Sequence, residues 1–164
     1  MNIKFVDFIG KDKVAKIGDI RKFEKLLPNP LPKEYVDYIL QYPTGEKPED
    51  DLFFDIKEYG VFDSDIVAET GMLDSLSSVK DLFMHFKCLS SNDWDEQSVP
   101  DDMVMIGDGG GSNGILIGIS GENRGKVFYW KESLFVCDES YSNYYGNIGL
   151  IANGFNDFIA CLRE

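Results

Sequence analysis

The sequence has few of the residues on which catalytic and metal sites depend. Its 164 residues include one histidine, His85, and three cysteines, Cys88, Cys137 and Cys161. The cysteines are odd in number, lack metal-type spacing and have apolar neighbours, which predicts buried free thiols in a reducing cytoplasm. With one histidine and scattered cysteines, the sequence offers no transition-metal site. We therefore expect neither a metal nor a cofactor.

Long apolar runs are also absent. No stretch approaches the ~18 uninterrupted apolar residues of a membrane span. The N-terminal stretch MNIKFVDFIGKDK is interrupted by Asp7 and Lys11 and has no small-residue cleavage site, so it is not typical of a signal peptide. These two absences predict a cytoplasmic protein that does not act at a membrane.

Positive charge is scarce as well. The chain has 16 basic and 29 acidic residues, a net charge of −13. Residues 46–108 hold 4 basic and 17 acidic residues, whereas residues 1–45 carry +2 and residues 109–164 carry −2. Diffuse acidity would serve solubility, but an excess in one segment favours a surface that attracts a basic partner. It argues against direct nucleic-acid binding, which needs lysine and arginine on one face.

Apolar periodicity predicts helices and strands in one domain over residues 1–164. The expected helices span 20–27 (Asp19 as N-cap), 33–41, 79–88 (capped by Ser77 or Ser78) and 155–162 (Asn153 as cap). The expected strands span 52–56, 103–106, 115–119 and 126–130, with an edge strand at 134–137. This order predicts an α+β fold, a mostly antiparallel bent sheet with helices from both ends of the chain packed on it.

The most unusual stretch is IGDGGGSNGILIG, from Ile106 to Gly118, which has five glycines between Gly107 and Gly114. It predicts a bulged turn between two strands, with several residues at positive φ. Three catalytic or ligand motifs fail here. Ser112 fits G-x-S-x-G, but a hydrolase would need a helix after it and a histidine further along the chain. A phosphate loop would need a following lysine, and a calcium loop a glutamate at the twelfth position.

One of the two tryptophans, Trp94, is a candidate for binding. Tyr129 and Trp130 end an expected strand, where alternation predicts that one of the two is buried. Trp94 lies in SNDWDEQ, surrounded by polar residues. An exposed tryptophan ringed by carboxylates is typical of a binding anchor. A tryptophan that fixes its own loop to the core would have the same neighbours, so both interpretations stay open.

Four short blocks, in order, resemble one known family. They are LPKEYVDYI from Leu31, VMIGDGGGSNGILIG from Val104, GKVFYW from Gly125, and the helix Phe155-Asn-Asp-Phe158. Together they resemble the SUKH superfamily, which includes the yeast Smi/Knr cell-wall regulator and many bacterial proteins. The chain departs from that pattern at Pro43-Thr44-Gly45, where family members usually have Asn-Gly-Gly.

The resemblance implies a non-catalytic α+β protein. Bacterial members are mostly immunity proteins that bind a cognate secreted toxin, often a nuclease, so we expect a cationic toxin domain as partner and leave the oligomeric state open. A regulatory scaffold of the yeast kind is the alternative, and a hydrolase using Ser112 is a remote one. The residues expected to contact the partner are Asp50, Asp51, Glu58, Trp94, Asp95 and Glu96. The residues matching the family's glycine-rich loop and aromatic strand are Gly107, Asp108, Gly109, Gly110 and Trp130.

Overall fold

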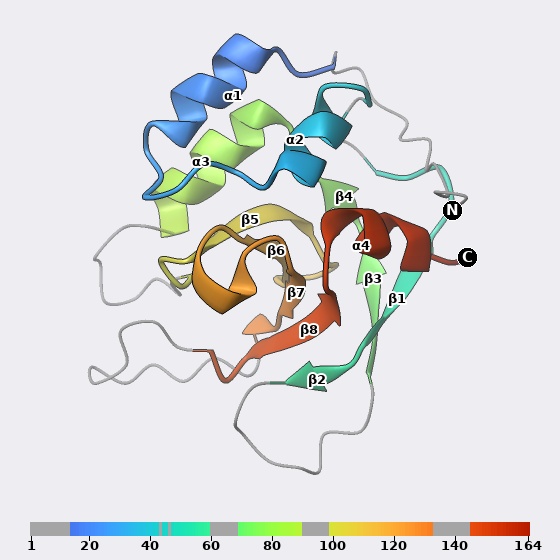
Figure 1. The fold of residues 1–164 in the computed structure, drawn as a ribbon. Coiled ribbons are helices and arrows are strands. Elements are labelled where there is room, and N and C mark those ends of the chain that lie inside the picture. Colours follow the sequence, from blue (N-terminus) through green and yellow to red (C-terminus); the bar gives the residue numbers. More distant parts are fainter. Residues whose placement is uncertain (1–13, 43, 46, 60–68, 90–98, 133–144) are drawn as a thin grey trace.

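The structure is a computed structural model that describes residues 14–42, 44–45, 47–59, 69–89, 99–132 and 145–164. Figure 1 shows its helices and strands in chain order. The helices are α1 (Ile17–Glu24), α2 (Lys33–Ile39), α3 (Val79–Leu89) and α4 (Phe155–Cys161), with a short 3-10 turn, η1 (Gly121–Asn123). The strands are β1 (Leu52–Ile56), β2 (Glu58–Tyr59), β3 (Glu69–Leu73), β4 (Ser75–Leu76), β5 (Met103–Asp108), β6 (Gly114–Gly118), β7 (Val127–Trp130) and β8 (Ile148–Ala152).

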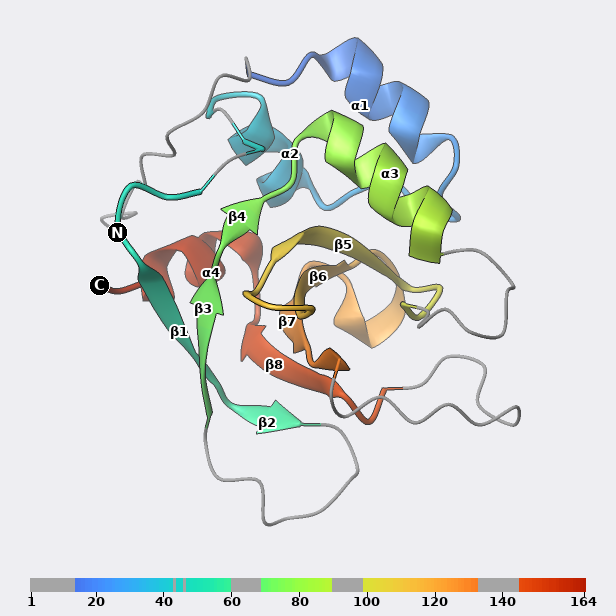
Figure 2. The same cartoon turned by 180° about the vertical axis from the view of Figure 1, so that it is seen from behind.

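The strands form two antiparallel sheets. The larger sheet has the order β2-β8-β7-β6-β5-β4, and β1 pairs with β3 in the smaller one. Strands β5 to β8 run as a meander that curls strongly in both views (Figures 1 and 2). Helices α1 and α3 lie side by side, while α4 packs near α2 and β8. The predicted α+β class, with helices from both ends of the chain on an antiparallel bent sheet, is confirmed.

The larger sheet has buried apolar side chains on both of its faces. The main apolar cluster takes side chains from all four helices and from both sheets. A second cluster contains Met103, Leu116, Phe128, Trp130 and Ile148. Because successive strand residues point to opposite faces, the two clusters lie on opposite sides of β6 and β7. Every residue of these two strands is buried.

The first helix begins earlier than predicted. The carbonyl of Lys16 accepts hydrogen bonds from the N–H groups of Asp19 (2.9 Å) and Ile20 (3.2 Å), so Lys16 is the N-cap. The prediction that Asp19 caps this helix is therefore wrong. Asp19 lies in the first turn, where its Oδ1 accepts from Nζ of Lys22 at 2.8 Å.

The predicted serine cap of α3 is confirmed at Ser78. The Ser78 hydroxyl oxygen accepts from the N–H of Asp81 (3.2 Å), and Oδ2 of Asp81 accepts from the N–H of Ser78 (2.9 Å). This reciprocal pair is a capping box built with aspartate instead of glutamate. It satisfies two N–H groups at the start of the helix.

The predicted Asn153 cap of α4 is wrong. Gly154 occupies the N-cap position and makes no side-chain capping bond. The carboxylate of Glu34, in α2, instead accepts from the N–H of Asn156 at 3.2 Å. The cap therefore comes from another helix, far away in the sequence.

The cysteines do not follow their predicted burial. Cys88 and Cys161 are exposed, because the inward positions of their helices are taken by larger apolar side chains such as Leu82, Phe155 and Phe158. The Cys161 sulfur is only part-buried and donates to the carbonyl of Phe158 (3.1 Å), although burial raises the pKa of its thiol. Cys137 and the predicted strand 134–137 lie outside the described residues.

Candidate binding surface

Part of the negative charge in residues 46–108 is neutralised by lysines and an arginine. Asp74 pairs with Lys47 (2.6 Å), Glu69 with Lys131 (2.7 Å) and Asp55 with Arg163 (2.5 Å). The hydrogen bond from Arg163 is the main reason that the pKa of Asp55 is below its usual value. These three carboxylates therefore serve the fold, because each holds together segments that are distant in the sequence.

A short run of acidic residues before β1 is not neutralised in this way. Glu49, Asp50 and Asp51 are exposed, and no ion pair within the described residues engages them. The main cause of a raised pKa of Lys47 is its hydrogen bond to Asp74, and the charge of Asp51 contributes further. We call Glu49, Asp50 and Asp51 the acidic corner. It presents three consecutive carboxylates to solvent.

A second acidic position lies at the start of β5 and is held by polar contacts. The Asp102 carboxylate accepts from the Tyr145 hydroxyl (2.6 Å) and from the side-chain amide of Asn123 (3.1 Å). Burial, followed by this bond to Asp102, raises the pKa of Tyr145. Asp102 thus ties the segment before β8 to the β6–β7 turn.

The structure describes only part of the predicted contact set. Asp50 and Asp51 are adjacent and exposed, as a contact role requires. Glu58 lies in β2, and its side chain is outside the described part of the structure. Trp94, Asp95 and Glu96 lie outside the described residues altogether. Their part in binding stays a prediction.

The glycine-rich loop has the conformation that the sequence predicts. Gly110 and Gly111 have φ of 78° and 64°, and the pairing of β5 with β6 shifts register between Met105 and Gly107. The Asn113 side chain closes the loop by donating to the Gly110 carbonyl (2.9 Å) and accepting from the N–H of Glu132 (3.1 Å). The loop is therefore tied to the residues that follow β7.

The glycines and Asp108 of the family signature pack against neighbouring elements. A Cβ at Gly107 would lie 2.4 Å from the Ser75 carbonyl oxygen, and one at Gly109 would lie 2.5 Å from the Tyr129 ring. The Asp108 carboxylate accepts from the Ser75 hydroxyl (2.9 Å), and β4 pairs with β5 at this point. These contacts give the signature a role in the fold.

Tyr129 and Trp130 are both buried, so the prediction that only one is buried is wrong. Tyr129 belongs to the main cluster and Trp130 to the second one, on the opposite face. The Tyr129 hydroxyl donates to the Gly109 carbonyl (3.3 Å), and burial raises the pKa of Tyr129 to about 12. The unbroken apolar sequence VFYW was the available signal, because it is typical of a strand buried on both sides.

Aromatic contacts join the sequence blocks that resemble the family into one core. Phe155 packs against Tyr35 and Tyr38 of α2, with ring centroids 5.0 and 5.1 Å apart, and against Phe158 at 5.9 Å. Phe54 of β1 then contacts Phe158 (6.0 Å) and Tyr129 (5.6 Å). A continuous path of rings therefore runs from α2 through α4 and β1 to β7 and the glycine-rich loop.

The surroundings of Ser112 do not match a nucleophile elbow. Ser112 is exposed, and the segment after it is strand β6, where the elbow needs a helix. His85 lies in α3, with Nδ1 3.4 Å from the Ser77 hydroxyl. Within the described ranges, no three histidine, cysteine or acidic side chains converge as a metal site would require. No described helix combines the length and apolar character needed to cross a bilayer.

Comparison with known proteins gives the family. No curated protein matches the sequence significantly. The model of the SMI1/KNR4 family (SUKH-1) matches residues 15–161, a span that contains all four sequence blocks and the ring path that links them. Since this match covers most of the 164 residues, the chain belongs to the SMI1/KNR4 family (SUKH-1).

Proposed function

We propose that this protein is an immunity protein, which binds a cognate toxin domain of basic charge and neutralises it in the cytoplasm. Membership of the SUKH family supports a role of this general type. The observation that carries the proposal is the acidic corner, because Glu49, Asp50 and Asp51 remain without ion pairs inside the described structure. Exposed charges that the fold does not neutralise are available to a partner.

The physical mechanism is electrostatic attraction followed by docking. A nuclease toxin needs a basic groove for its substrate, and an acidic protein that covers or flanks this groove would block it. Complementary charge raises association rates by ~10 to 1,000-fold, and salt weakens the effect because exposed charges are screened beyond about 8 Å at physiological ionic strength. Asp50 and Asp51 would contact the toxin, together with Glu58, Trp94, Asp95 and Glu96.

The first step of the experiment is to capture the partner from native cells with the tagged full chain. The association rate of the purified toxin domain with this chain is then measured. The test variants are Asp50→Lys with Asp51→Lys, Asp95→Lys with Glu96→Lys, and all four changes together. The matched control is Glu122→Lys with Asp157→Lys, two exposed acidic residues on η1 and α4. The control changes the net charge by the same amount as each double variant.

We expect the quadruple variant to lower the association rate by about tenfold or more at low salt and the control to lower it much less. The midpoint of thermal unfolding should not fall in the Asp50, Asp51, Asp95 and Glu96 variants, since none of the described carboxylates among them makes an ion pair within the described part of the chain. Association that is indifferent to salt and to the quadruple change would refute binding through the acidic segment. Equal effects of the control would show that only net charge matters.

A further inference from the structure

Helices α1 and α3 run side by side, in the same direction, at one end of the molecule (Figures 1 and 2). Their N-terminal ends meet at a small pocket that residues of both helices line. Further along, the ring of Phe23 in α1 packs against Phe83 (5.2 Å between centroids) and Phe86 (5.9 Å) of α3. These three rings mark the seam between the helices. None of the motifs discussed above lies on the outer side of this pair.

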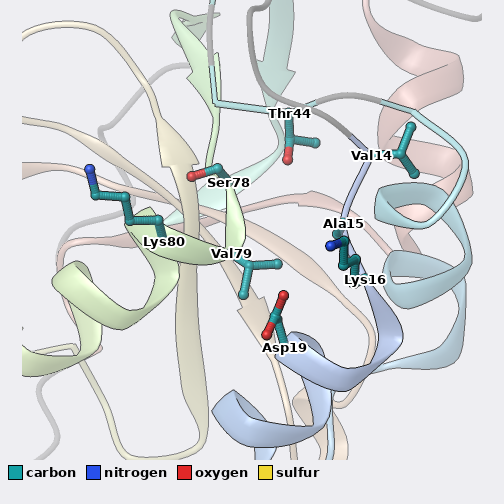
Figure 3. A pocket seen from close by; sticks show the side chains of 8 residues that line it. All are labelled: Val14, Ala15, Lys16, Asp19, Thr44, Ser78, Val79 and Lys80. Carbon is teal, nitrogen blue, oxygen red and sulfur yellow. The ribbon is translucent and has the colours of Figure 1, made fainter.

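The solvent side of the seam carries basic and apolar side chains. Lys80 and Lys87 lie three residues before and four residues after Phe83, so they are its neighbours on the helix surface. Leu26 lies three residues after Phe23. Figure 3 shows Lys80 directed away from the pocket, toward the outside of the pair. We call the exposed residues on this side the basic face: Lys22, Lys25, Leu26, Lys80, Met84 and Lys87.

The carboxylates of the same two helices are engaged inside the fold. Asp19 accepts from Lys22 (2.8 Å), and Asp81 belongs to the capping box of α3. Glu24 accepts from the N–H of Leu31 (3.0 Å). No ion pair to a described residue engages the three other lysines of the basic face. This surface is therefore positive in a chain whose net charge is −13.

Exposed apolar side chains gather in the same place. Among the described residues, five large apolar side chains are exposed, and four of them lie on α1 or α3 or beside α1: Val14, Ile17, Leu26 and Met84. On the basic face, Leu26 is 49% and Met84 is 53% exposed. Single exposed apolar residues are ordinary, but a group of them rimmed by charged residues is typical of a protein contact surface. The basic face therefore fits a protein partner with an acidic surface.

The acidic corner is a surface of this kind on the same molecule. Its three residues, 49–51, are exposed and lead into β1. Strand β1 lies on the side of the molecule away from α1 and α3 in both views (Figures 1 and 2). Opposite charges on opposite sides of one molecule suit a head-to-tail contact between copies. A two-fold contact between two basic faces would instead bring like charges together.

We propose that the basic face binds the acidic corner of a second copy of this chain. The lysines pair with the carboxylates, and Leu26 and Met84 are covered by the neighbouring copy. Repulsion between two molecules of net charge −13 is screened beyond about 8 Å at physiological ionic strength, so the charges inside the contact decide its sign. The contact needs no toxin and can fail independently of the proposed function, although a toxin bound at the acidic corner would compete with it.

The test is sedimentation equilibrium of the purified full chain at physiological ionic strength, at concentrations up to about 1 mM, where weak contacts are still detected. The average mass should rise continuously with concentration, because a head-to-tail assembly keeps a free surface at each end. A chain that stays monomeric would overturn the proposal and leave a foreign acidic protein as the occupant of the basic face. Growth that stops at a dimer would also overturn it, because such a dimer indicates a two-fold contact.

Two double variants remove the charge of one surface each. Lys80→Gln with Lys87→Gln acts on the basic face, and Asp50→Asn with Asp51→Asn acts on the acidic corner. Each should lower the association constant by about tenfold or more. The matched control for the lysine pair, which should associate within about twofold of the parent chain, neutralises two exposed lysines elsewhere, Lys33→Gln with Lys57→Gln. Equal loss in the control would overturn the role of the basic face.

An equimolar mixture of the two double variants tests the pairing itself. Each variant keeps one intact surface, so the mixture should form a one-to-one complex with an affinity within about twofold of the parent contact, while each variant alone stays monomeric. A monomeric mixture, under conditions in which the parent chain associates, would overturn the pairing of these two surfaces. Thermal unfolding establishes that each variant is folded.

The apolar part of the contact is tested by Met84→Gln, which keeps the length of the side chain and its preference for a helix. Losing the burial of the thioether should weaken association by several-fold. An unchanged association constant would overturn the part assigned to Met84.

Discussion

Gly107 lies against the backbone of Ser75, and Gly109 lies against the ring of Tyr129. In both places the missing side chain lets another element approach: β4 beside β5 in the first case and an aromatic ring of β7 in the second. The glycine-rich stretch therefore has several physical reasons for its composition, of which positive φ at Gly110 and Gly111 is only one. The local sequence does not predict that another element approaches these glycines so closely.

At the residue scale we predict that alanine destabilises the protein at Gly107 and Gly109 and stabilises it at Gly18. Gly107→Ala should destabilise the protein by about 2 kcal/mol or more, because the neighbouring atom is a backbone oxygen, and Gly109→Ala by about 1–3 kcal/mol. Gly18→Ala is the matched control, because nothing lies within 4 Å of its Cβ position in α1. It should stabilise the protein by up to about 1 kcal/mol.

Chemical denaturation of the three glycine variants measures these changes in the free energy of unfolding. A neutral Gly107→Ala would mean that β4 does not approach β5 as closely as described. The measurement does not depend on knowing the partner.

Among the elements, those with a complete apolar pattern could be predicted from the sequence. Helices α2 and α3 and strands β1, β6 and β7 begin and end within a few residues of their expected positions. Strands β2, β3, β4 and β8 were missed, because two of them have only two residues and the other two have a glycine inside the strand, whereas the glycines of β6 lie at its ends. Strands of this kind form because a partner strand supplies their hydrogen bonds, and the local sequence carries little of that information.

The capping of α4 gives a prediction at the scale of elements. Glu34→Ala removes the carboxylate that accepts from the N–H of Asn156, so it should destabilise the protein by about 0.5–1 kcal/mol. Asn153→Ala should change the free energy of unfolding by less, because the Asn153 side chain does not cap the helix. Urea denaturation of both variants compares them directly. The reverse order would restore Asn153 as the cap.

Over the whole molecule, the sequence predicted where negative charge is concentrated but not which carboxylates the fold neutralises. Asp55 and Glu69 pair with Arg163 and Lys131, which are 108 and 62 residues away along the chain. Such pairs depend on the packing of the C-terminus beside β1 and of β7 near β3. The sequence was enough to propose Asp50 and Asp51 as contacts. It could not predict that these two carboxylates lack ion pairs to the described residues.

Charge in the acidic corner should therefore oppose folding while Asp55 supports it. We predict that Asp50→Asn with Asp51→Asn raises the midpoint of thermal unfolding at low salt, because it relieves repulsion in a chain of net charge −13, and that added salt removes the gain. Asp55→Asn is the contrasting variant and should lower the midpoint at neutral pH.

The pH dependence of these variants separates the two roles. Because Arg163 lowers the pKa of Asp55 in the folded protein, its contribution to stability is present above the ordinary carboxyl pKa of about 4 and is lost as the pH falls through the lowered value. The parent chain and Asp55→Asn should therefore converge in stability at acid pH. If the Asp50 and Asp51 variant is also less stable than the parent at neutral pH, the acidic corner serves the fold. If the Asp50 and Asp51 variant is instead more stable than the parent but binds the toxin less well, these two charges serve binding and lower the stability of the free protein.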